Sequence, residues 1–296
     1  MVSLKKILLT GGAGFIGKNA AEQLSLLYDV AAPTRQELDL LNPGSVKEFF
    51  TRFQFDIVVH LAAAGVSRSK PKEVDVFRKN TEMFLNLASN ANGWSRLINL
   101  GSGAEYDISQ NLVNVKESQF GQNPPKDDYG RAKYFISEQI QKSKNMMNLR
   151  CFGVFGKYED YASRFISNAI CRALAGLPIV VGQNRVFDYI YVNDLVKIIA
   201  FFINHEPGEK FYNACSGQRI ELLNLAELVK LVTGSKLEIQ IKRPGVGPVY
   251  SGDNSKLLGE LGEFEFTPLK QAIEQLVLWY RENWALIDKA KLNFDA

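Results

Sequence analysis

Histidine and cysteine are scarce in this chain of 296 residues, which contains two histidines and three cysteines. His60 and His205 lie far apart in the sequence, so we expect no histidine-based metal cluster and predict no metal site. The three cysteines are Cys151, Cys171 and Cys215, and their spacing pairs none of them. This excludes a disulfide scaffold and a zinc motif, and it indicates a reducing compartment.

The chain also lacks an excess of one charge and any long apolar run. Its 35 basic and 32 acidic residues leave a net charge of +3, which provides no electrostatic case for binding nucleic acid. A short basic run at residues 68–72 contains a proline and precedes Glu73, so we interpret it as a solvated loop and helix start. No stretch of about 18 uninterrupted apolar residues occurs, so no membrane partner is expected. The apolar N-terminus is too short for a signal peptide, and we expect a cytoplasmic protein.

What the sequence does contain is an alternation of short apolar runs with longer amphipathic segments. Alternation of this kind is typical of βα units on a parallel sheet. We therefore predict an α/β fold, with a doubly wound parallel Rossmann sheet and a smaller C-terminal lobe. The run at residues 56–61 is apolar on both faces, which predicts burial from both sides and makes His60 a core residue. Strands are predicted at 6–9, 30–32, 57–61, 97–100 and 148–152, and helices at 15–27, 46–53, 74–90 and 129–144.

A glycine-rich turn, Thr10–Gly17, joins the first predicted strand to the first predicted helix. Its glycines let the backbone turn tightly and approach a pyrophosphate, which the N–H groups at the helix N-terminus hold. The position of the turn between a strand and a helix is more specific than the glycine pattern alone. We predict that Gly11, Gly14, Phe15, Ile16 and Gly17 contact a dinucleotide cofactor.

The end of the second predicted strand bears on the choice of coenzyme. NAD-specific sheets usually end this strand with an acidic residue that binds the ribose 2′-hydroxyl. Here Thr34 and Arg35 stand at that position, and a guanidinium group suits a 2′-phosphate. Glu37 is close enough to keep NAD as the alternative. We predict NADP as the cofactor.

A tyrosine and a lysine lie in the first turns of the helix predicted at 129–144. Tyr129 and Lys133 stand at i and i+4, on one helical face, and Ser102 follows the fourth predicted strand. A tyrosine is a poor base near neutral pH, and we expect the Lys133 ammonium and the nicotinamide ring to lower its pKa. Ser102 would then hold the reacting hydroxyl or carbonyl while Tyr129 transfers a proton and the nicotinamide a hydride.

These motifs make the sequence similar to the extended short-chain dehydrogenase/reductase family of NAD(P)-dependent nucleotide-sugar epimerases, dehydratases and reductases. The resemblance covers nearly the whole chain and includes Leu149–Phe152 and Asp188–Leu195. Residues 35–41 also resemble the NADPH-dependent GDP-fucose synthases, in which an arginine meets the 2′-phosphate. The resemblance implies that Asp39 and Leu40 flank the adenine, that Leu61, Ala62 and Ala63 run under the cofactor, that Asn80 orders the catalytic helix, and that Phe152 lies near the nicotinamide.

Two departures from the family motifs narrow the expected chemistry. The dehydratases follow the catalytic Ser or Thr with Asp-Glu, and GDP-fucose synthases place a cysteine acid two residues after the serine. Here these positions hold Gly103 and Ala104. We therefore expect neither elimination nor epimerisation beside a ketone, which leaves redox chemistry at one carbon, C4. Ser102 and Gly103 are expected to contact the sugar.

The residues expected at the nucleotide end of the substrate depart further from the family pattern. Gly153 replaces an asparagine, Phe187 replaces an arginine, and Val246 replaces the acid of an Arg-Pro-Gly-Asp motif. Arg185 and Arg243 remain as the expected ligands of the substrate diphosphate.

The pattern of alternating segments loosens after Gly156. A helix is predicted at 161–175, a short strand at 179–181, and a segment at 189–192 that leads into a helix at 193–203. The last third contains the segments 222–233 and 236–241, a loop at 243–245 and a terminal helix near 269–291. We assign residues 1–156, with parts of 179–215, to an NAD(P)-binding Rossmann domain. Residues 157–178 and 216–296 are assigned to an interleaved, smaller nucleotide-sugar-binding lobe.

Three functions are consistent with these residues. The favoured one is NADPH-dependent reduction of an NDP-4-keto-6-deoxyhexose, and the alternative is an NDP-sugar 4-epimerase or 4-dehydrogenase with tightly bound NAD. A cofactor-binding regulatory subunit is the third, but an intact set of Ser102, Tyr129 and Lys133 argues against it. Family members commonly dimerise through two long helices, here 74–90 and 129–144, so we expect a homodimer.

Overall fold

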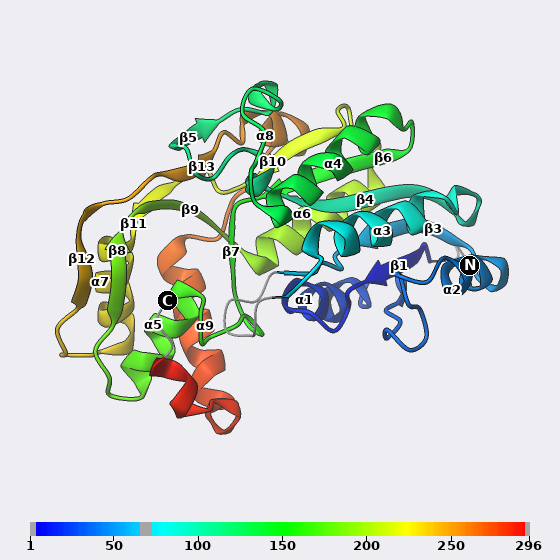
Figure 1. Cartoon of the computed structure of the whole chain (residues 1–296). Helices are drawn as coiled ribbons and strands as arrows, with labels where there is room; N and C mark the ends of the chain where they lie inside the picture. The colour runs from blue at the N-terminus through cyan, green and yellow to red at the C-terminus, as the bar shows by residue number, and fades with distance from the viewer. Residues whose placement is uncertain (1–3, 66–72, 294–296) are drawn as a thin grey trace.

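The computed structural model describes residues 4–65 and 73–293 of the chain. Figure 1 shows a larger part that contains the N-terminus, and a smaller lobe on the left that carries the C-terminal helices. Within the described ranges, no helix is both long enough and apolar enough to cross a membrane.

A six-stranded parallel sheet forms the centre of the larger part. Its strands are β1 (Lys6–Thr10), β2 (Asp29–Ala31), β3 (Phe55–His60), β4 (Trp94–Ser102), β6 (Met146–Cys151) and β10 (Phe211–Ala214). They lie in the order β10-β6-β4-β3-β1-β2, so the order reverses at β1. In open parallel sheets, ligands bind outside the carboxyl ends of the strands at such a switch point. The predicted doubly wound parallel fold is confirmed.

Helices cover both faces of this sheet because its strands are apolar on both faces. Ile7 and Leu9 join one core cluster, whereas Leu8 between them joins another on the opposite face. His60 is also buried, and its Nδ1 shares a 2.8 Å hydrogen bond with Thr10 Oγ1, as expected of a core residue. The helices are α1 (Phe15–Leu24), α6 (Val192–Asn204) and α8 (Ser255–Leu261) on one side and α2 (Pro43–Arg52), α3 (Val76–Ala88) and α4 (Asp128–Lys142) on the other.

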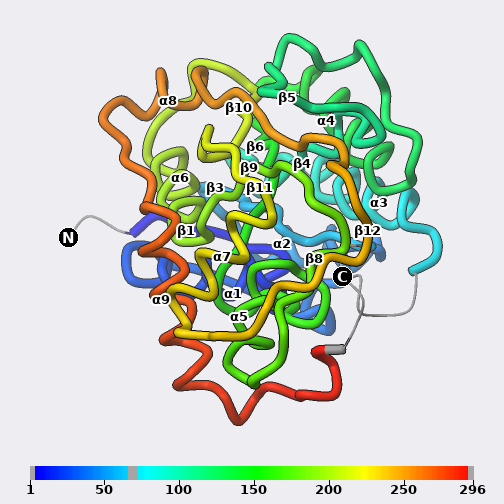
Figure 2. Tube along the Cα trace, turned by 90° about the vertical axis from the view of Figure 1, so that its left-hand side faces the viewer, coloured from blue at the N-terminus to red at the C-terminus, as the bar shows by residue number. Residues whose placement is uncertain are grey.

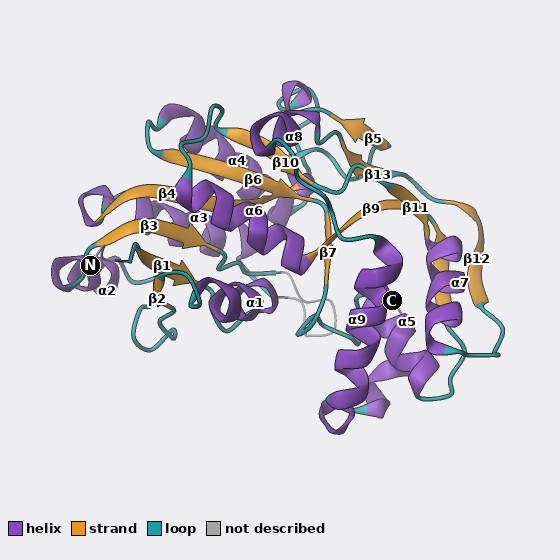
Figure 3. Cartoon of the chain, turned by 180° about the vertical axis from the view of Figure 1, so that it is seen from behind, coloured by secondary structure: helices purple, strands orange, loops and turns teal. Residues whose placement is uncertain are grey.

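A second sheet joins the larger part to the smaller lobe. It contains β5 (Leu112–Val115), β7 (Gly153–Phe155), β9 (Val186–Tyr191), β11 (Arg219–Glu221) and β13 (Tyr250–Gly252). Beside it, β8 (Val180–Asn184) pairs with β12 (Gln240–Val246). The helices α5 (Phe165–Leu174), α7 (Leu222–Thr233) and α9 (Leu269–Glu282) pack together in the lobe (Figure 3).

The chain passes repeatedly between the two sheets. Strand β5 lies early in the sequence but pairs with β13, and the later strand β10 pairs with β6 in the central sheet. Short 3₁₀ helices connect several elements: η1 (Ala91–Gly93), η2 (Gly103–Glu105), η3 (Glu117–Gln119), η4 (Trp284–Leu286) and η5 (Lys289–Asn293). The two-domain division made from the sequence stays a prediction.

Two local predictions are wrong. Residues 243–245, predicted as a loop, lie within β12, which runs beside β8 in Figure 2. A register shift between Arg243 and Val246, with Gly245 at φ +81, lets an outer strand contain Pro244. The predicted helix 269–291 ends at Glu282, where the backbone nitrogen and the side-chain Nδ2 of Asn283 both donate to the Trp279 carbonyl, at 3.0 and 2.9 Å.

Candidate active site

The glycine turn lies against the carboxyl end of β3. Gly11 has φ +73, and a Cβ atom on it would stand 2.6 Å from the Ala62 nitrogen. A Cβ atom on Gly17 would collide with the Gly11 carbonyl. Only glycine permits the positive φ at position 11 and the close contact between the turn and Ala62. The turn and residues 61–63 therefore lie side by side at the switch point, and both are expected to hold the cofactor.

The N-terminus of α1 is suited to an anion. Among the described residues, no side chain caps this end of the helix, and no acidic residue stands in its first turn. The first N–H groups and the positive end of the helix dipole are therefore available to a pyrophosphate. Gly14 is the N-cap residue, and the half-buried Phe15 and Ile16 follow it. These residues fit the dinucleotide cofactor predicted from the sequence.

Arg35 stands exposed beyond the end of β2. Its side chain is 77% exposed, and its Nε lies 3.5 Å from Asp39 Oδ1. The Glu37 carboxylate instead accepts hydrogen bonds from Thr34, at 2.7 Å from the backbone nitrogen and 2.9 Å from Oγ1. These bonds lower the pKa of Glu37. With Glu37 engaged, Arg35 is the more available group for a 2′-substituent. Leu40 is buried in the core, where it packs beneath this segment.

Asn80 orders the loop that follows β3. Its Oδ1 accepts from the Ala64 nitrogen at 3.0 Å, and its Nδ2 donates to the carbonyls of Ala64 and Val76 at 3.2 and 2.8 Å. The family resemblance implied that Asn80 orders the catalytic helix, but these bonds stay within α3 and the loop before it. Asn80 therefore supports the backbone next to residues 61–63.

The three predicted catalytic residues converge at the end of β4. Ser102 ends that strand, and Tyr129 in the first turn of α4 forms a hydrogen bond with it. Lys133 lies one helical turn further on, where its Nζ donates to the Leu100 carbonyl at 2.7 Å. The same Nζ is 5.9 Å from the centre of the Tyr129 ring. Helix α4 thus brings both of its functional groups against the strand that carries Ser102.

The electrostatics of this cluster differ from the sequence expectation. Burial raises the pKa of Tyr129 to about 12, although the hydrogen bond with Ser102 and the charge of Arg164 oppose this. Burial also lowers the pKa of Lys133 to about 8. Without cofactor, desolvation therefore outweighs the two effects that lower the pKa of Tyr129, the Ser102 hydrogen bond and the Arg164 charge. In the protein without cofactor, Tyr129 is a protonated phenol that can donate to an oxygen atom.

A second phenol, Tyr250, was missed by sequence reasoning. It opens β13, forms a hydrogen bond with Ser102, and lies with its ring centre 5.0 Å from that of Phe152. A Cβ atom on Gly103 would stand 2.5 Å from Tyr250 Oη and 2.8 Å from the Phe152 ring. Burial raises the pKa of Tyr250, so this hydroxyl stays protonated. No periodicity in the segment around it marks Tyr250 as a site residue.

None of the three residues after Ser102, residues 103–105, presents an acidic group at the surface. Gly103 and Ala104 carry none, and Glu105 is 1% exposed and paired with Arg150 at 2.6 Å. Its carboxylate oxygens accept hydrogen bonds from the Ser102 backbone nitrogen and from Ser137 Oγ. Glu105 is therefore not placed to abstract a proton from a sugar.

A row of side chains leads from Ser102 to the two expected diphosphate ligands. The Phe187 ring centre is 5.9 Å from that of Tyr250, and the Arg185 guanidinium is 5.4 Å from the Phe187 ring. Burial lowers the pKa of Arg185, and the charge of Arg243 lowers it further. The effect of that charge indicates that the two arginines are neighbours. Arg185 Nε also donates to the Pro248 carbonyl at 3.2 Å, while Arg243 is exposed on β12.

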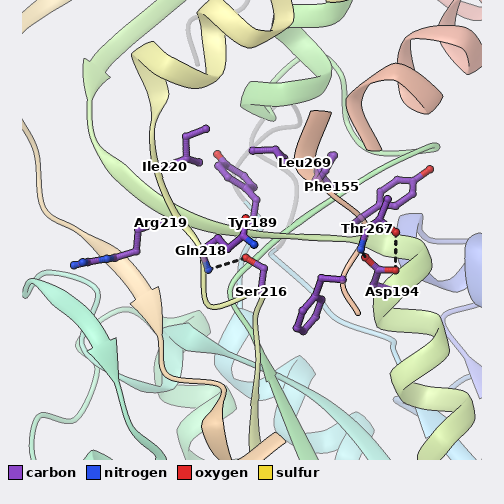
Figure 4. A pocket seen from close by; sticks show the side chains of 11 residues that line it. Phe155, Tyr189, Asp194, Ser216, Gln218, Arg219, Ile220, Thr267 and Leu269 are labelled. Carbon is purple, nitrogen blue, oxygen red and sulfur yellow. Dashed lines mark hydrogen bonds between the residues drawn. The ribbon is translucent and has the colours of Figure 1, made fainter. Parts of the chain in front are cut away.

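A separate cavity of about 130 Å³ lies between β9, β11 and the start of α9 (Figure 4). The Asp194 side chain at its edge is already engaged by Thr267, at 2.8 Å from the backbone nitrogen and 2.9 Å from Oγ1. None of the predicted cofactor, catalytic or substrate residues is among the described residues that line it. Nor does the described part of the chain hold a group of three or more His, Cys, Asp or Glu residues suited to a metal. The lining residues are Phe155, Tyr189, Tyr191, Asp194, Ser216, Gln218, Arg219, Ile220, Phe266, Thr267 and Leu269.

A parallel sheet whose strand order reverses at β1, followed by this glycine turn, is typical of dinucleotide-binding α/β proteins. Comparison with known families gives the more specific class. Residues 7–215 match the NAD dependent epimerase/dehydratase family, and the chain belongs to that family. The family predicted from the sequence is thereby confirmed.

Individual relatives are similar over nearly their whole length. The GDP-6-deoxy-D-talose 4-dehydrogenase of Aggregatibacter actinomycetemcomitans is 25% identical, with 92% of this chain and 96% of the relative covered. The structure of Thermotoga maritima UDP-glucose 4-epimerase with UDP-glucose has a TM-score of 0.82 at 23% identity, covering 94% of this chain and 99% of the other. The NADP-bound GDP-mannoheptose C4 reductase of Campylobacter jejuni has a TM-score of 0.79 at 22% identity, covering 95% and 99%.

Proposed function

We propose that this chain is an NADP-dependent oxidoreductase that acts at C4 of a nucleotide-activated sugar, and that it reduces an NDP-4-keto-6-deoxyhexose. The observation that carries the proposal is the set of groups around Ser102. Two protonated phenols, Tyr129 and Tyr250, meet the Ser102 hydroxyl, and the one acid among residues 103–105, Glu105, is buried and paired with Arg150. Such a site can move one proton at one oxygen atom.

The proposed chemistry assigns one role to each residue. Ser102 donates a hydrogen bond to the C4 carbonyl oxygen, and Tyr129 donates its phenolic proton to the same oxygen as the carbonyl becomes an alcohol. The Lys133 ammonium stabilises the phenolate that remains. A nicotinamide dinucleotide held by the glycine turn and the N-terminus of α1 would supply the hydride for C4. Tyr250, whose hydroxyl group packs against Gly103, donates a second hydrogen bond.

The proposed cofactor and substrate orientation follow from the charges at the two ends of the site. Arg35 is exposed next to an engaged Glu37, which supports NADPH over NADH. Arg185 and Arg243 stand beyond Phe187 and would hold the diphosphate of the substrate. Relatives whose names include a GDP-sugar 4-dehydrogenase and a GDP-heptose C4 reductase support chemistry at C4.

The homodimer and the cytoplasmic location stay predictions. Helices α3 and α4 pack against each other, as the Phe77 and Phe135 rings do with centres 6.1 Å apart. All three cysteines are free and buried, which is compatible with a reducing compartment.

The proposed function is tested by supplying NADPH with GDP- and UDP-linked 4-keto-6-deoxyhexoses in D₂O and following the product by proton NMR. We expect one NADPH to be oxidised per sugar and a single C4 alcohol to form. Deuterium at C3 or C5 under enzyme control would contradict the single-carbon assignment. Conversion of UDP-glucose to UDP-galactose without NADPH oxidation would instead identify a 4-epimerase with retained NAD.

A further inference from the structure

A buried ion pair lies directly behind Ser102. Arg150 Nε donates to Glu105 Oε2 at 2.6 Å, and each residue is 1% exposed. Taking two charges out of water is costly, and a buried pair is often no more stabilising than apolar residues of similar volume. Packing alone therefore gives no reason for this pair.

The Glu105 carboxylate holds the backbone of Ser102. Its Oε1 accepts a hydrogen bond from the Ser102 nitrogen at 3.0 Å, while Ser102 Oγ accepts from the Ala104 nitrogen at 3.1 Å. Together the two bonds close the short turn η2. The backbone and the hydroxyl group of Ser102 are thus set by the same turn.

The same carboxylate also reaches the helix that carries Tyr129. Ser137 Oγ donates to Glu105 Oε2 at 2.5 Å. Tyr129, Lys133 and Ser137 follow one another at intervals of four residues on α4, so they share one face of the helix. Glu105 therefore bridges the end of β4, with Ser102, to the face of α4 that presents Tyr129.

The surroundings keep this bridge in one place. The Arg150 guanidinium lies 4.4 and 4.7 Å from the ring centres of Phe120 and Phe211. Asn148 Nδ2 donates to both Glu105 oxygens at 3.0 and 3.2 Å. A Cβ atom on residue 101 would overlap the Glu105 carboxylate, so the glycine there makes room for it. Several buried hydrogen bonds thus hold the Glu105 carboxylate, and a buried network of this kind is rigid.

We propose that Glu105, neutralised by Arg150, is a positioning residue that sets the place of Ser102 relative to Tyr129. This inference rests on the proposed function, in which both residues act on the same oxygen atom. Cutting the bridge should lower kcat by roughly 10- to 100-fold, because small displacements of a reacting group have effects of this size. KM should change by less than about threefold, because substrate binding is retained.

Two variants remove the bridge in different ways. Glu105→Leu combined with Arg150→Met removes both charges and leaves neither unpaired, so the fold should be retained. Glu105→Gln keeps the shape, but its amide NH₂ must oppose either Arg150 Nε or the Ser102 nitrogen, both of which are donors. Glu138→Gln, on the residue next to Ser137, is the matched control and should leave kcat unchanged. If neither Glu105 variant folds, Ser137→Ala removes the contact of Glu105 with α4, together with the bonds that Asn148 and Arg150 donate to Ser137 Oγ, and leaves the Glu105–Ser102 bond in place.

Each variant is made in the natural sequence and together with Ser102→Ala. Steady-state kcat and KM are measured with NADPH and a GDP-linked 4-keto-6-deoxyhexose, and with UDP-glucose in the epimerase assay. We expect the bridge variants to lower kcat when Ser102 is present and to have no further effect once its hydroxyl is gone. Equal losses in both backgrounds would show a purely structural role and overturn this proposal alone. Full activity of Ser102→Ala, or no turnover of either sugar by the unmodified protein, would overturn the proposed function itself.

Discussion

The hydroxyl group of Tyr250 occupies the space that a side chain on residue 103 would need. A Cβ atom on Gly103 would stand 2.5 Å from Tyr250 Oη and 2.8 Å from the Phe152 ring. The residues at positions 103 and 250 therefore depend on each other. Because residue 103 is glycine, the phenol of Tyr250 on the distant strand β13 can pack next to Ser102. In the proposed function this phenol replaces an acid at position 103 and limits the site to one proton transfer.

Gly103→Ala should disturb this arrangement. We expect it to lower the free energy of unfolding by about 1–3 kcal/mol, as is typical of overpacking, and to lower kcat because Tyr250 and Ser102 move apart. Adding Tyr250→Phe should recover part of the lost stability, because it removes the closer of the two contacts. Gly259→Ala, on an exposed helical glycine with no atom near its Cβ position, is the control and should not destabilise the protein. Denaturant unfolding measures all three, and an unaffected Gly103→Ala would contradict the contact.

Tyr129→Phe should keep cofactor affinity and lose most turnover. Only the phenolic hydroxyl that transfers the proton is removed, and general acid–base groups usually contribute 10²–10⁴-fold. Tyr134→Phe on the same helix is the matched control, because Tyr134 stacks on Phe120 away from Ser102. Steady-state kinetics with NADPH, together with cofactor titration, separates the two effects. Retention of more than about a tenth of kcat would exclude Tyr129 as the general acid.

Arg35→Ala should decide the coenzyme. We expect it to weaken NADP binding by about 1.5–3 kcal/mol, the range of a charge-assisted hydrogen bond, and to leave NAD binding nearly unchanged. Arg52→Ala, which removes another exposed arginine at the end of α2, should change neither. Isothermal titration with each dinucleotide provides the comparison. Equal losses for NADP and NAD would mean that Arg35 does not contact a 2′-phosphate.

Glu159 should make stability depend on pH. It is buried with Ser167 Oγ at 2.6 Å, and burial raises its pKa from 4.5 to about 8. The folded chain therefore keeps this proton between about pH 4.5 and 8, while the unfolded chain releases it. The stability linked to the protonated group is complete below pH 4.5 and is lost as the pH rises through 8.

Glu159→Gln removes this titration. Between pH 5 and pH 8, the natural protein should lose roughly 2–4 kcal/mol more unfolding free energy than the variant. Glu282→Gln, at an exposed position on α9, should follow the natural protein. Chemical denaturation across this pH range measures the difference, and parallel curves for the Glu159→Gln variant and the natural protein would refute the assignment.

Much of the central sheet was predictable because its signals are local. The strand β1, the glycine turn and α1 follow one another within a few residues, so hydrophobic period and glycine placement suffice to identify them. The same holds for Tyr129 and Lys133, whose relation depends only on helical geometry. The second sheet was less predictable: β7, β11 and β13 have three residues each, too few for a period to be read.

The sequence by itself determined the family, the parallel sheet, the cofactor turn and the Ser102, Tyr129 and Lys133 set, because each is encoded by neighbouring residues or by a contiguous motif. Only the tertiary structure decided that Tyr250 meets Ser102, and that Glu105 faces Arg150 rather than the site. It also decided the pKa of Tyr129, where burial outweighs the Ser102 hydrogen bond and the charge of Arg164. These properties depend on contacts between distant segments and on exclusion of water, which no local pattern of residues specifies.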